Sequence, residues 1–320
     1  MRRIQKVGGN KVVVLPILSS LAMIFIMIIP GIFFRKRNIL TVEQNGAVNS
    51  IVVNLTWPCL VIDAMQIEFS VQTLKDTGYI LIACLAIFAV LLLFSIPVIR
   101  LMRLTKTKQY LTMFMLLFGN TGFIGIPVIK ALYGTEALFF AAIVEFINDI
   151  LLFTVGVLLI QMSAGADPRI NLKELVSPGL VGVIIGLVLF LMDFRLPSVL
   201  GGSIEMIGNA TTPLTMFSIG FQLGGIRLKE ILNDWQVYAV LFVKLLIVPC
   251  IALMMIRLWA GEFTLLEKVL VLSFAMPVAS VSAIFSQQYK GEAAFATKSV
   301  LLSTVLSLAT IPVFAILLEL

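Results

Sequence analysis

The stretch Leu117-Phe-Gly-Asn-Thr-Gly-Phe-Ile-Gly-Ile-Pro127 places three glycines, a proline and two polar residues inside an otherwise apolar run. Glycine and proline weaken a helix, and proline also lacks a backbone N–H. In hydrocarbon, each freed backbone group costs several kcal/mol unless protein or cavity water satisfies it. We therefore predict that a helix is interrupted here, and that the interruption is buried in protein or lines a cavity. The alternative interpretation is a proline kink in an ordinary membrane helix.

A second stretch of similar character, Phe274-Ala-Met-Pro-Val-Ala-Ser-Val-Ser282, belongs to an internal repeat. Asn54-Leu-Thr-Trp-Pro58 matches Asn209-Ala-Thr-Thr-Pro213, and Tyr133-Gly-Thr-Glu136 matches Tyr289-Lys-Gly-Glu292, both at an offset near 155 residues. Chance similarity is the alternative. A genuine repeat predicts that both stretches interrupt equivalent helices. The half-helices that follow would then present free N–H groups and a positive dipole end near the membrane midplane, which suits a carboxylate.

The composition of the chain is that of a membrane protein. Of its 320 residues, 60% are hydrophobic and 12% are charged, whereas soluble domains have roughly 45–50% and about 25%. A bilayer-spanning helix uses about 20 residues. Apolar runs bounded by charges predict ten such helices, at residues 12–34, 45–66, 77–99, 110–131, 138–160, 178–193, 203–223, 235–257, 266–288 and 294–318. The predicted fold class is an all-α polytopic membrane protein.

The repeat divides this predicted fold into parts. They are an N-terminal tail (1–11), a first five-helix repeat (12–160), a connecting loop (161–177) and a second five-helix repeat (178–320). Because five spans are an odd number, the second repeat enters the membrane from the opposite side. Inverted repeats of this kind, with discontinuous helices at corresponding positions, are typical of secondary transporters.

The positions of lysine and arginine predict the orientation. The cluster Arg35-Lys-Arg37 and the basic residues between Arg100 and Lys108 directly flank predicted spans, and such clusters favour the cytoplasmic side. We therefore expect a multi-pass protein of the cell membrane, surrounded by the lipid bilayer, with both termini outside. The basic N-terminus argues for the reverse, and nine or eleven spans are the alternative. Because the basic residues border apolar runs, we expect no nucleic-acid partner.

The absence of certain residues excludes several kinds of site. The chain has no histidine, and its three cysteines lie within apolar runs. No Ser/His or Cys/His nucleophile pair and no histidine relay can form, and the sequence offers no metal-ligand pattern. No GxxxxGK[ST] phosphate-binding loop occurs. We therefore expect neither an enzyme nor a metal or organic cofactor, with H⁺ or Na⁺ as possible coupling ions.

Three charged residues fall well inside predicted spans. Glu145 and Asp149 lie one helical turn apart on one helix face, with Asn148 beside them. Lys244 lies at a similar depth in the span 235–257, which permits an ion pair with Asp149 if the two helices touch. Our hypothesis is that these charges bind a coupling proton or cation. The alternative is a static buried pair, or a lysine that reaches the membrane surface.

Both Asn-x-Thr motifs of the repeat lie inside apolar runs, out of reach of a glycosylating enzyme. We interpret Asn54 and Asn209, together with Pro58 and Pro213, as polar interruptions of their helices, comparable to the one at Pro127. The alternative is that these side chains bond to a neighbouring helix.

Five motifs of the chain stand out together: Gly119-Asn-Thr-Gly-Phe-Ile-Gly-Ile-Pro-Val-Ile-Lys-Ala-Leu-Tyr-Gly134, Ala275-Met-Pro277, Gln287-Gln-Tyr-Lys-Gly291, Gly31 ahead of Arg35, and Trp57-Pro58. They resemble the auxin efflux carrier family, whose prokaryotic members include malate and malonate permeases. The resemblance covers about residues 12–318. It implies two inverted five-helix repeats, a scaffold and a mobile transport domain, and helices four and nine that cross at the binding site.

Carried over to this chain, the implied crossing falls at Gly119-Asn-Thr121 and at Met276-Pro277, with Asn120 as a polar contact to an organic anion. The chain departs from the plant carriers in two ways. It lacks their long central cytoplasmic loop, and it has Gly119 where they have proline. The resemblance therefore does not imply auxin as the substrate.

Taken together, the sequence predicts a secondary transporter of a small organic anion, such as the dicarboxylates malate or malonate, that works by alternating access. A passive channel or a membrane sensor on the same fold is the alternative, and a homodimer is compatible with either. The expected substrate-binding residues are Gly119, Asn120, Thr121, Gly122, Asn148, Met276 and Pro277. The expected coupling residues are Glu145, Asp149 and Lys244.

Overall fold

The computed structural model describes residues 5–169, 177–225, 234–261 and 263–319, which form helices and loops without a strand. Residues 1–4 of the predicted tail and 170–176 of the predicted connecting loop lie outside this description. Two apolar helices are short, Thr121–Tyr133 and Pro178–Leu191. Six stretches are long and apolar enough to cross a membrane: Val14–Lys36, Val42–Ala64, Val71–Leu101, Glu136–Ser163, Trp235–Ala260 and Ala293–Leu317.

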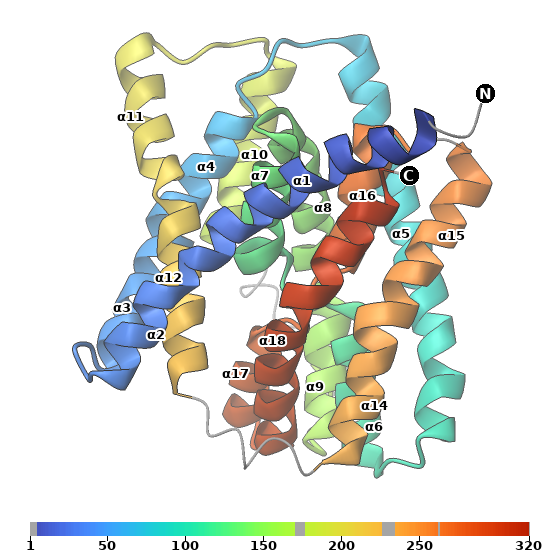
Figure 1. Ribbon diagram of the computed structural model, residues 1–320. Helices are drawn as coiled ribbons and strands as arrows, with labels where there is room; N and C mark the ends of the chain where they lie inside the picture. The colour runs from blue at the N-terminus through green and yellow to red at the C-terminus, as the bar shows by residue number, and fades with distance from the viewer. Residues whose placement is uncertain (1–4, 170–176, 226–233, 262, 320) are drawn as a thin grey trace.

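Figure 1 shows the order of the helices along the chain by colour. In the text, η denotes a short π-helical segment. The predicted tail is helical from Gln5 onward, because α1 begins there. Up to residue 163 the elements are α1 (Gln5–Ile26), α2 (Ile28–Lys36), α3 (Val42–Ile51), η1 (Val52–Thr56), α4 (Trp57–Ala64), α5 (Val71–Leu101), α6 (Lys106–Leu117), η2 (Thr121–Gly125), α7 (Ile126–Tyr133), α8 (Glu136–Leu151), η3 (Leu152–Gly156) and α9 (Val157–Ser163). From residue 178 they are α10 (Pro178–Leu191), α11 (Ser198–Asn209), α12 (Thr211–Gly224), α14 (Trp235–Phe242), η5 (Val243–Ile247), α15 (Val248–Ala260), α16 (Leu265–Phe274), α17 (Val281–Gln288) and α18 (Ala293–Leu317).

Prolines account for three of the π-helical segments. Pro58, Pro127 and Pro249 each stand second in the α-helix that follows such a segment. A proline donates no hydrogen bond and its ring pushes away the carbonyl four residues earlier, so the preceding turn widens into a π-bulge. At Pro58 and Pro127 the helix therefore continues through a wide turn instead of being interrupted as predicted. Pro213 stands third in α12, after a break at Ala210.

Helices α2 and α12 touch backbone to backbone. A Cβ atom on Gly31 would lie 2.0 Å from the Phe217 carbonyl oxygen, and one on Gly220 would lie 1.9 Å from the Ile28 carbonyl oxygen. No side chain fits at such distances, so both positions require glycine. In a membrane, where lipid is as apolar as leucine, this close van der Waals packing is what holds helices together.

Helix α4 is enclosed by glycines of two other helices. A Cβ atom on Gly182 of α10 would lie 3.0 Å from Pro58 Cα, and one on Gly208 of α11 would lie 2.8 Å from Leu60 Cα. Gly186, one turn after Gly182, faces the end of α4, since a Cβ atom there would lie 2.6 Å from Met65 Sδ. Helices α4, α10 and α11 consequently form one tight unit.

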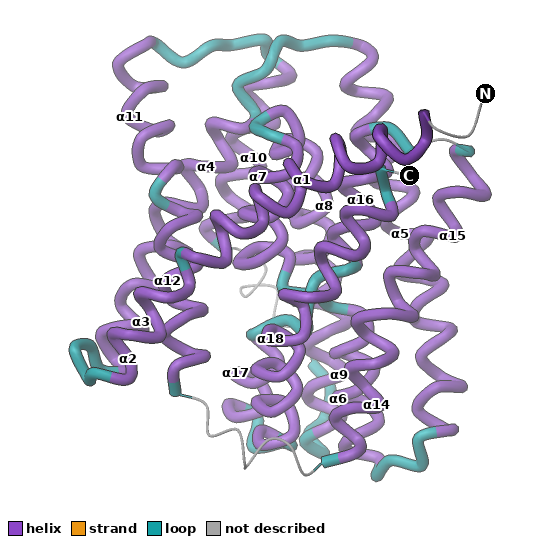
Figure 2. Tube along the Cα trace, viewed as in Figure 1, coloured by secondary structure: helices purple, strands orange, loops and turns teal. Residues whose placement is uncertain are grey.

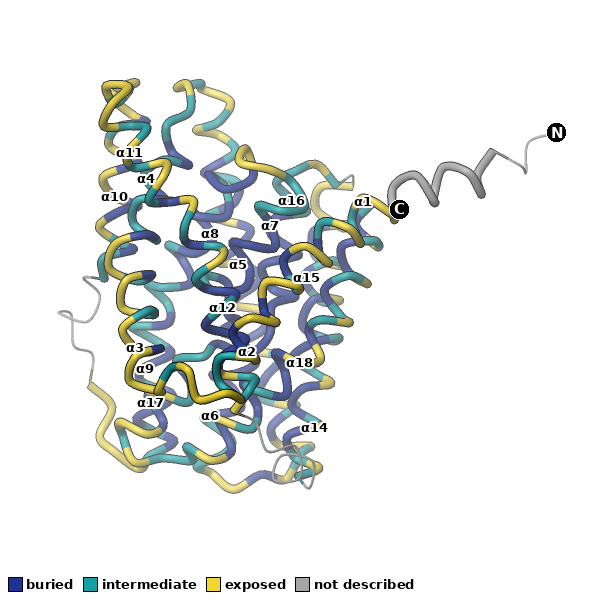
Figure 3. Tube along the Cα trace, turned by 60° about the vertical axis from the view of Figure 1, so that its left-hand side comes forward, coloured by how far each residue is buried: buried dark blue, intermediate teal, exposed yellow. Residues whose placement is uncertain are grey.

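The helices pack as two groups. Group one consists of α2–α4 and α10–α12, and group two of α5–α9 and α14–α18, so each group takes helices from both halves of the sequence. Helix α1 runs diagonally across the molecule and packs on α2, α7 and α18 (Figure 1). In the same view α11 extends beyond α7 and α16 at one end, while α14 extends beyond α2 and α3 at the other. Buried residues concentrate in the middle of the molecule (Figure 3).

Candidate binding site at the paired helix interruptions

Two helices of group two are interrupted at the stretches singled out in the sequence. Residues 118–120 separate α6 from η2, and residues 275–280 separate α16 from α17. The two loops meet near the middle of the molecule (Figure 2), where Gly119 and Val278 form an isolated antiparallel bridge. We refer to residues 118–120 and 275–280 as the paired segments.

The paired segments satisfy each other's backbone groups. The N–H of Asn120 donates to the Pro277 carbonyl at 2.7 Å, and the N–H of Ala279 donates to the Phe118 carbonyl at 3.2 Å. Since no water is available in hydrocarbon, this mutual bonding is what allows unwound backbone to persist inside a membrane protein.

Glycines allow the segments to approach. A Cβ atom on Gly119 would lie 3.3 Å from the Cβ of Met276, and one on Gly125 would lie 3.2 Å from the Met276 Cγ. Met276 has no exposed surface. Met276 and Pro277, both predicted to contact substrate, therefore supply packing and a backbone acceptor in this structure.

The Asn120 side chain joins the two segments a second time. Its amide Nδ2 donates to the Ser280 hydroxyl at 2.9 Å, and the Val278 N–H donates to the Ser303 hydroxyl of α18 at 3.2 Å. The sequence interpretation missed both serines as site residues. Ser280 could have been found from its place in the glycine-free second stretch, where polar residues are few; Ser303 gives no such signal, because it lies in an ordinary helix.

A buried acid contacts the start of the helix Thr121–Tyr133, which follows the first paired segment. The Thr121 hydroxyl donates to the Glu145 carboxylate, and both side chains are less than one-tenth exposed. A Cβ atom on Gly122 would lie 2.7 Å from Glu145 Oε1. Of the predicted residues, the structure thus brings Asn120, Thr121, Gly122 and Glu145 together.

A small cavity lies against the first segment, with a volume of about 10 Å³, room for about one water molecule. Its polar lining consists of Gly119, Thr121, Asn148 and Ser273, and its apolar lining of Phe88, Leu117, Val144 and Phe274. Asn148 of α8 is buried and lines the same cavity as Thr121. Ser273, at the end of α16, is a lining residue that the sequence interpretation did not single out.

Lys244 has a different partner from the one expected. In an uninterrupted helix the Asn120 N–H would bond to the Leu116 carbonyl, but here it bonds to Pro277. Lys244 Nζ donates to that freed Leu116 carbonyl at 3.2 Å, and its side chain is fully buried. The expected ion pair with Asp149 is wrong for the described residues, because η5 packs on α6 and α18, which places the ammonium at the end of α6.

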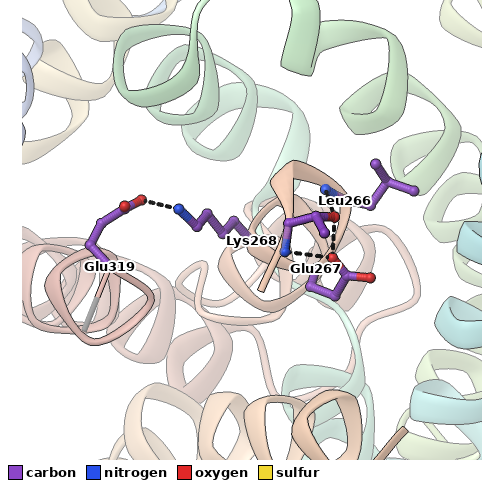
Figure 4. A network of polar contacts seen from close by, with 5 residues as sticks. Leu266, Glu267, Lys268 and Glu319 are labelled. Carbon is purple, nitrogen blue, oxygen red and sulfur yellow. Dashed lines mark hydrogen bonds and ion pairs between the residues drawn. The ribbon is translucent and has the colours of Figure 1, made fainter. Parts of the chain in front are cut away.

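The ion pair found among the described residues lies at the start of α16. Lys268 Nζ lies 2.7 Å from Glu319 Oε1, near the end of the chain (Figure 4). Next to it, Glu267 accepts the N–H of Thr264 at 2.8 Å and completes a capping box. These contacts fix the helix that leads into the second interruption.

The asparagines of the two Asn-x-Thr motifs have different hydrogen-bond partners, one in its own helix and the other in a neighbouring helix. Asn54 Nδ2 donates to the Ser50 carbonyl of its own helix at 2.8 Å. Asn209, the last residue of α11, accepts a hydrogen bond of 2.7 Å from Lys130 Nζ of α7. The contact at Lys130 thus connects group two with group one, which agrees with the alternative reading that such side chains bond to a neighbouring helix.

Comparisons with known proteins find similar sequences along most of the chain. The sequence profile of the family described as "Membrane transport protein" matches residues 16–315. An uncharacterized transporter of Methanothermobacter thermautotrophicus is 24% identical, over 92% of this chain and 96% of its own length. One of Methanocaldococcus jannaschii is 26% identical, over 90% and 94%. A protein of Rhizobium meliloti named "Putative malonate transporter" is 22% identical, over 84% and 85%.

The profile match covers nearly the whole chain, including both paired segments. The two archaeal relatives are named as transporters, and the similarity extends over almost their full length. The several membrane-spanning helices fit the same assignment. The chain therefore belongs to the membrane transport protein family, the auxin efflux carrier family that its sequence resembles, and is a multi-pass membrane transporter rather than an enzyme.

Proposed function

We propose that this protein is a secondary transporter that carries a small organic anion across the cell membrane by alternating access, with the paired segments as its binding site. The observation that supports this most is the buried unwound backbone at residues 118–120, with amide and hydroxyl side chains beside it. Membrane proteins keep such backbone only within protein or next to a water-filled cavity, and carriers bind their substrates there.

A carboxylate is the substrate class that the donors favour. The first N–H groups of the helix Thr121–Tyr133 have no partner within that helix, and the helix start favours negative charge. The amides of Asn120 and Asn148 and the hydroxyl of Thr121 add further donors. Each charge-assisted hydrogen bond contributes on the order of 1.5–3 kcal/mol. Malonate and malate are the first probes, because a relative's name contains malonate.

Alternating access fits the unequal contacts of the two half-helices with group one. Helix α7 packs on α12, and Lys130 near its end bonds to Asn209 of α11. Helix α17 packs on α6, α9 and α18 of its own group. A carrier that is closed on one side has this asymmetry, so we propose that group two slides past group one and that the contact at Lys130 breaks during the cycle.

The proposed topology has ten spans in two inverted repeats, 12–160 and 178–320, with both termini outside. One contact supports the count locally. Ser163 Oγ, at the end of α9, donates to the Thr107 carbonyl, at the start of α6, at 2.7 Å. The two residues therefore lie at the same end of the molecule, which is compatible with two crossings between them, the fourth and fifth predicted spans.

Purified protein in liposomes tests the function. We expect labelled malonate or malate to enter with saturating kinetics, and unlabelled substrate inside the vesicles to accelerate this entry, because an alternating-access carrier exchanges. A flux that grows linearly with concentration and shows no exchange would identify a channel instead. Failure of a panel of small carboxylates both to enter and to raise the melting temperature would contradict the proposed substrate class.

A further inference from the structure

The contact between Thr121 and Glu145 lies between the cavity and the protein interior. Thr121 lines the cavity, and its hydroxyl donates to the carboxylate of Glu145 on α8, a residue that is not part of the cavity lining. The glycine at position 122 leaves room for that carboxylate, since a Cβ atom there would lie 2.7 Å from Glu145 Oε1. Glu145 is therefore held against the first turn of the half-helix that begins at the proposed binding site.

No lysine compensates the charge of Glu145 in the described residues. Lys244 is bonded to the Leu116 carbonyl at the end of α6. Asp149, one turn away, and the buried thiol of Cys84 on α5 are the ionisable groups that face Glu145. Among the other helices packed on α8, α10 has no ionisable residue. The charged residues of α4, α7 and α16 have other neighbours: Asp63 lies near Lys130 and Glu205, Lys130 bonds to Asn209, Lys268 to Glu319 and Glu267 to Thr264.

We propose that Glu145 is the proton-binding site of this carrier and that the Thr121 hydroxyl links proton binding to anion binding; the inference rests on the proposed function. An ionised carboxylate only accepts hydrogen bonds, so it holds the Thr121 hydrogen and leaves hydroxyl lone pairs toward the cavity. A protonated carboxyl can donate to Thr121 Oγ1. The Thr121 hydrogen then turns into the cavity and donates to a substrate carboxylate.

The consequence is symport. One proton binds Glu145 from the side to which the site is open, the anion binds next to it, and both leave on the opposite side. Protonation also removes a negative charge beside the incoming anion, and two like charges at membrane depth are unfavourable. The loaded carrier thus moves one proton together with the anion, and the empty carrier returns with Glu145 ionised after the proton has left.

The test compares wild type with Glu145→Gln in liposomes that contain a pH-sensitive dye. With labelled malonate or malate we expect wild type to acidify the lumen as substrate enters. An inward proton gradient should raise substrate accumulation at least fivefold. Glu145→Gln should keep exchange but lose both effects, because an amide cannot carry the proton. Glu136→Gln, an exposed acid at the start of the same helix, should behave as wild type.

Each contrary result has a distinct meaning. Net uptake by wild type without acidification of the lumen, or net uptake driven by a Na⁺ gradient instead, would overturn the inference and leave the proposed function standing. Equal proton movement in Glu145→Gln would also overturn it. Loss of all saturable exchange in wild type would overturn the proposed function and the inference with it. If Glu145→Gln does not fold, Thr121→Val replaces it: we expect substrate uptake that no longer responds to the proton gradient, and an intact response would refute the link through Thr121.

Discussion

At the scale of single residues, Asn120 makes two hydrogen bonds to the second paired segment. Its backbone N–H donates to the Pro277 carbonyl, and its side-chain amide donates to the Ser280 hydroxyl. In the proposed complex, the Asn120 amide exchanges its hydrogen bond to Ser280 for one to a substrate carboxylate. We therefore expect Asn120→Ala to weaken apparent affinity for malonate or malate about tenfold to a hundredfold, the equivalent of one charge-assisted hydrogen bond. Uptake at varied substrate concentration measures this. Asn54→Ala, which removes an amide bonded within its own helix, is the matched control, and an equal loss there would argue against Asn120 as a contact.

Lys244 is a second residue whose role a pair of substitutions can test. Because its ammonium serves the Leu116 carbonyl, Lys244→Met should lower stability by about 1.5–3 kcal/mol, the range for a hydrogen bond to a charged group. Asp149→Asn should not rescue the loss, and the two effects on thermal unfolding should add. Rescue in the double variant would show that the two side chains form an ion pair after all.

At the scale of helices, the contact between α2 and α12 tolerates no side chain. Gly220→Ala would bring a Cβ atom to within 1.9 Å of a carbonyl oxygen, so we expect loss of the folded protein on size-exclusion chromatography. Gly46 in α3 and Gly78 in α5 have nothing within 4 Å of the same position. Alanine at either site should instead stabilise by about 0.5–1 kcal/mol. Similar melting temperatures for all three variants would rule out the close packing.

How far the sequence predicts these elements depends on whether the signal is local. The interruptions at 118–120 and 275–280 are predictable, because glycine, proline and polar residues act on their own stretch of backbone. The partner of each freed backbone group is not, since the bond from Asn120 to Pro277 joins distant segments. The positions of Lys244 and Asp149 within their predicted spans indicate similar depths in the membrane. They do not indicate which helices are neighbours, so the predicted ion pair was wrong. Pro58 and Pro127 were predicted to interrupt their helices, but each helix continues through a wide π-helical turn.

At the scale of the whole molecule, the proposed sliding of group two past group one can be tested by crosslinking. In a variant without Cys59, Cys84 and Cys250, cysteines replacing Lys130 and Asn209 would join the groups through a short bifunctional thiol reagent. We expect this crosslink to stop uptake and a cleavable version to restore it on reduction. Cysteines replacing Lys108 and Gln236, which bond at 2.8 Å inside group two, should crosslink without effect. Unchanged uptake with the first pair joined would contradict relative movement of the groups.

The bridge between Gly119 and Val278 also bears on how the protein is made. The ribosome synthesises the second segment roughly 160 residues after the first, which takes about 8–30 s at about 5–20 residues per second. During that interval the Asn120 N–H and the Phe118 carbonyl have no final partner. The α6–α7 region can therefore complete its backbone hydrogen bonds only after residues 275–280 have been synthesised. Biogenesis of this transporter ends only when its last third has entered the membrane.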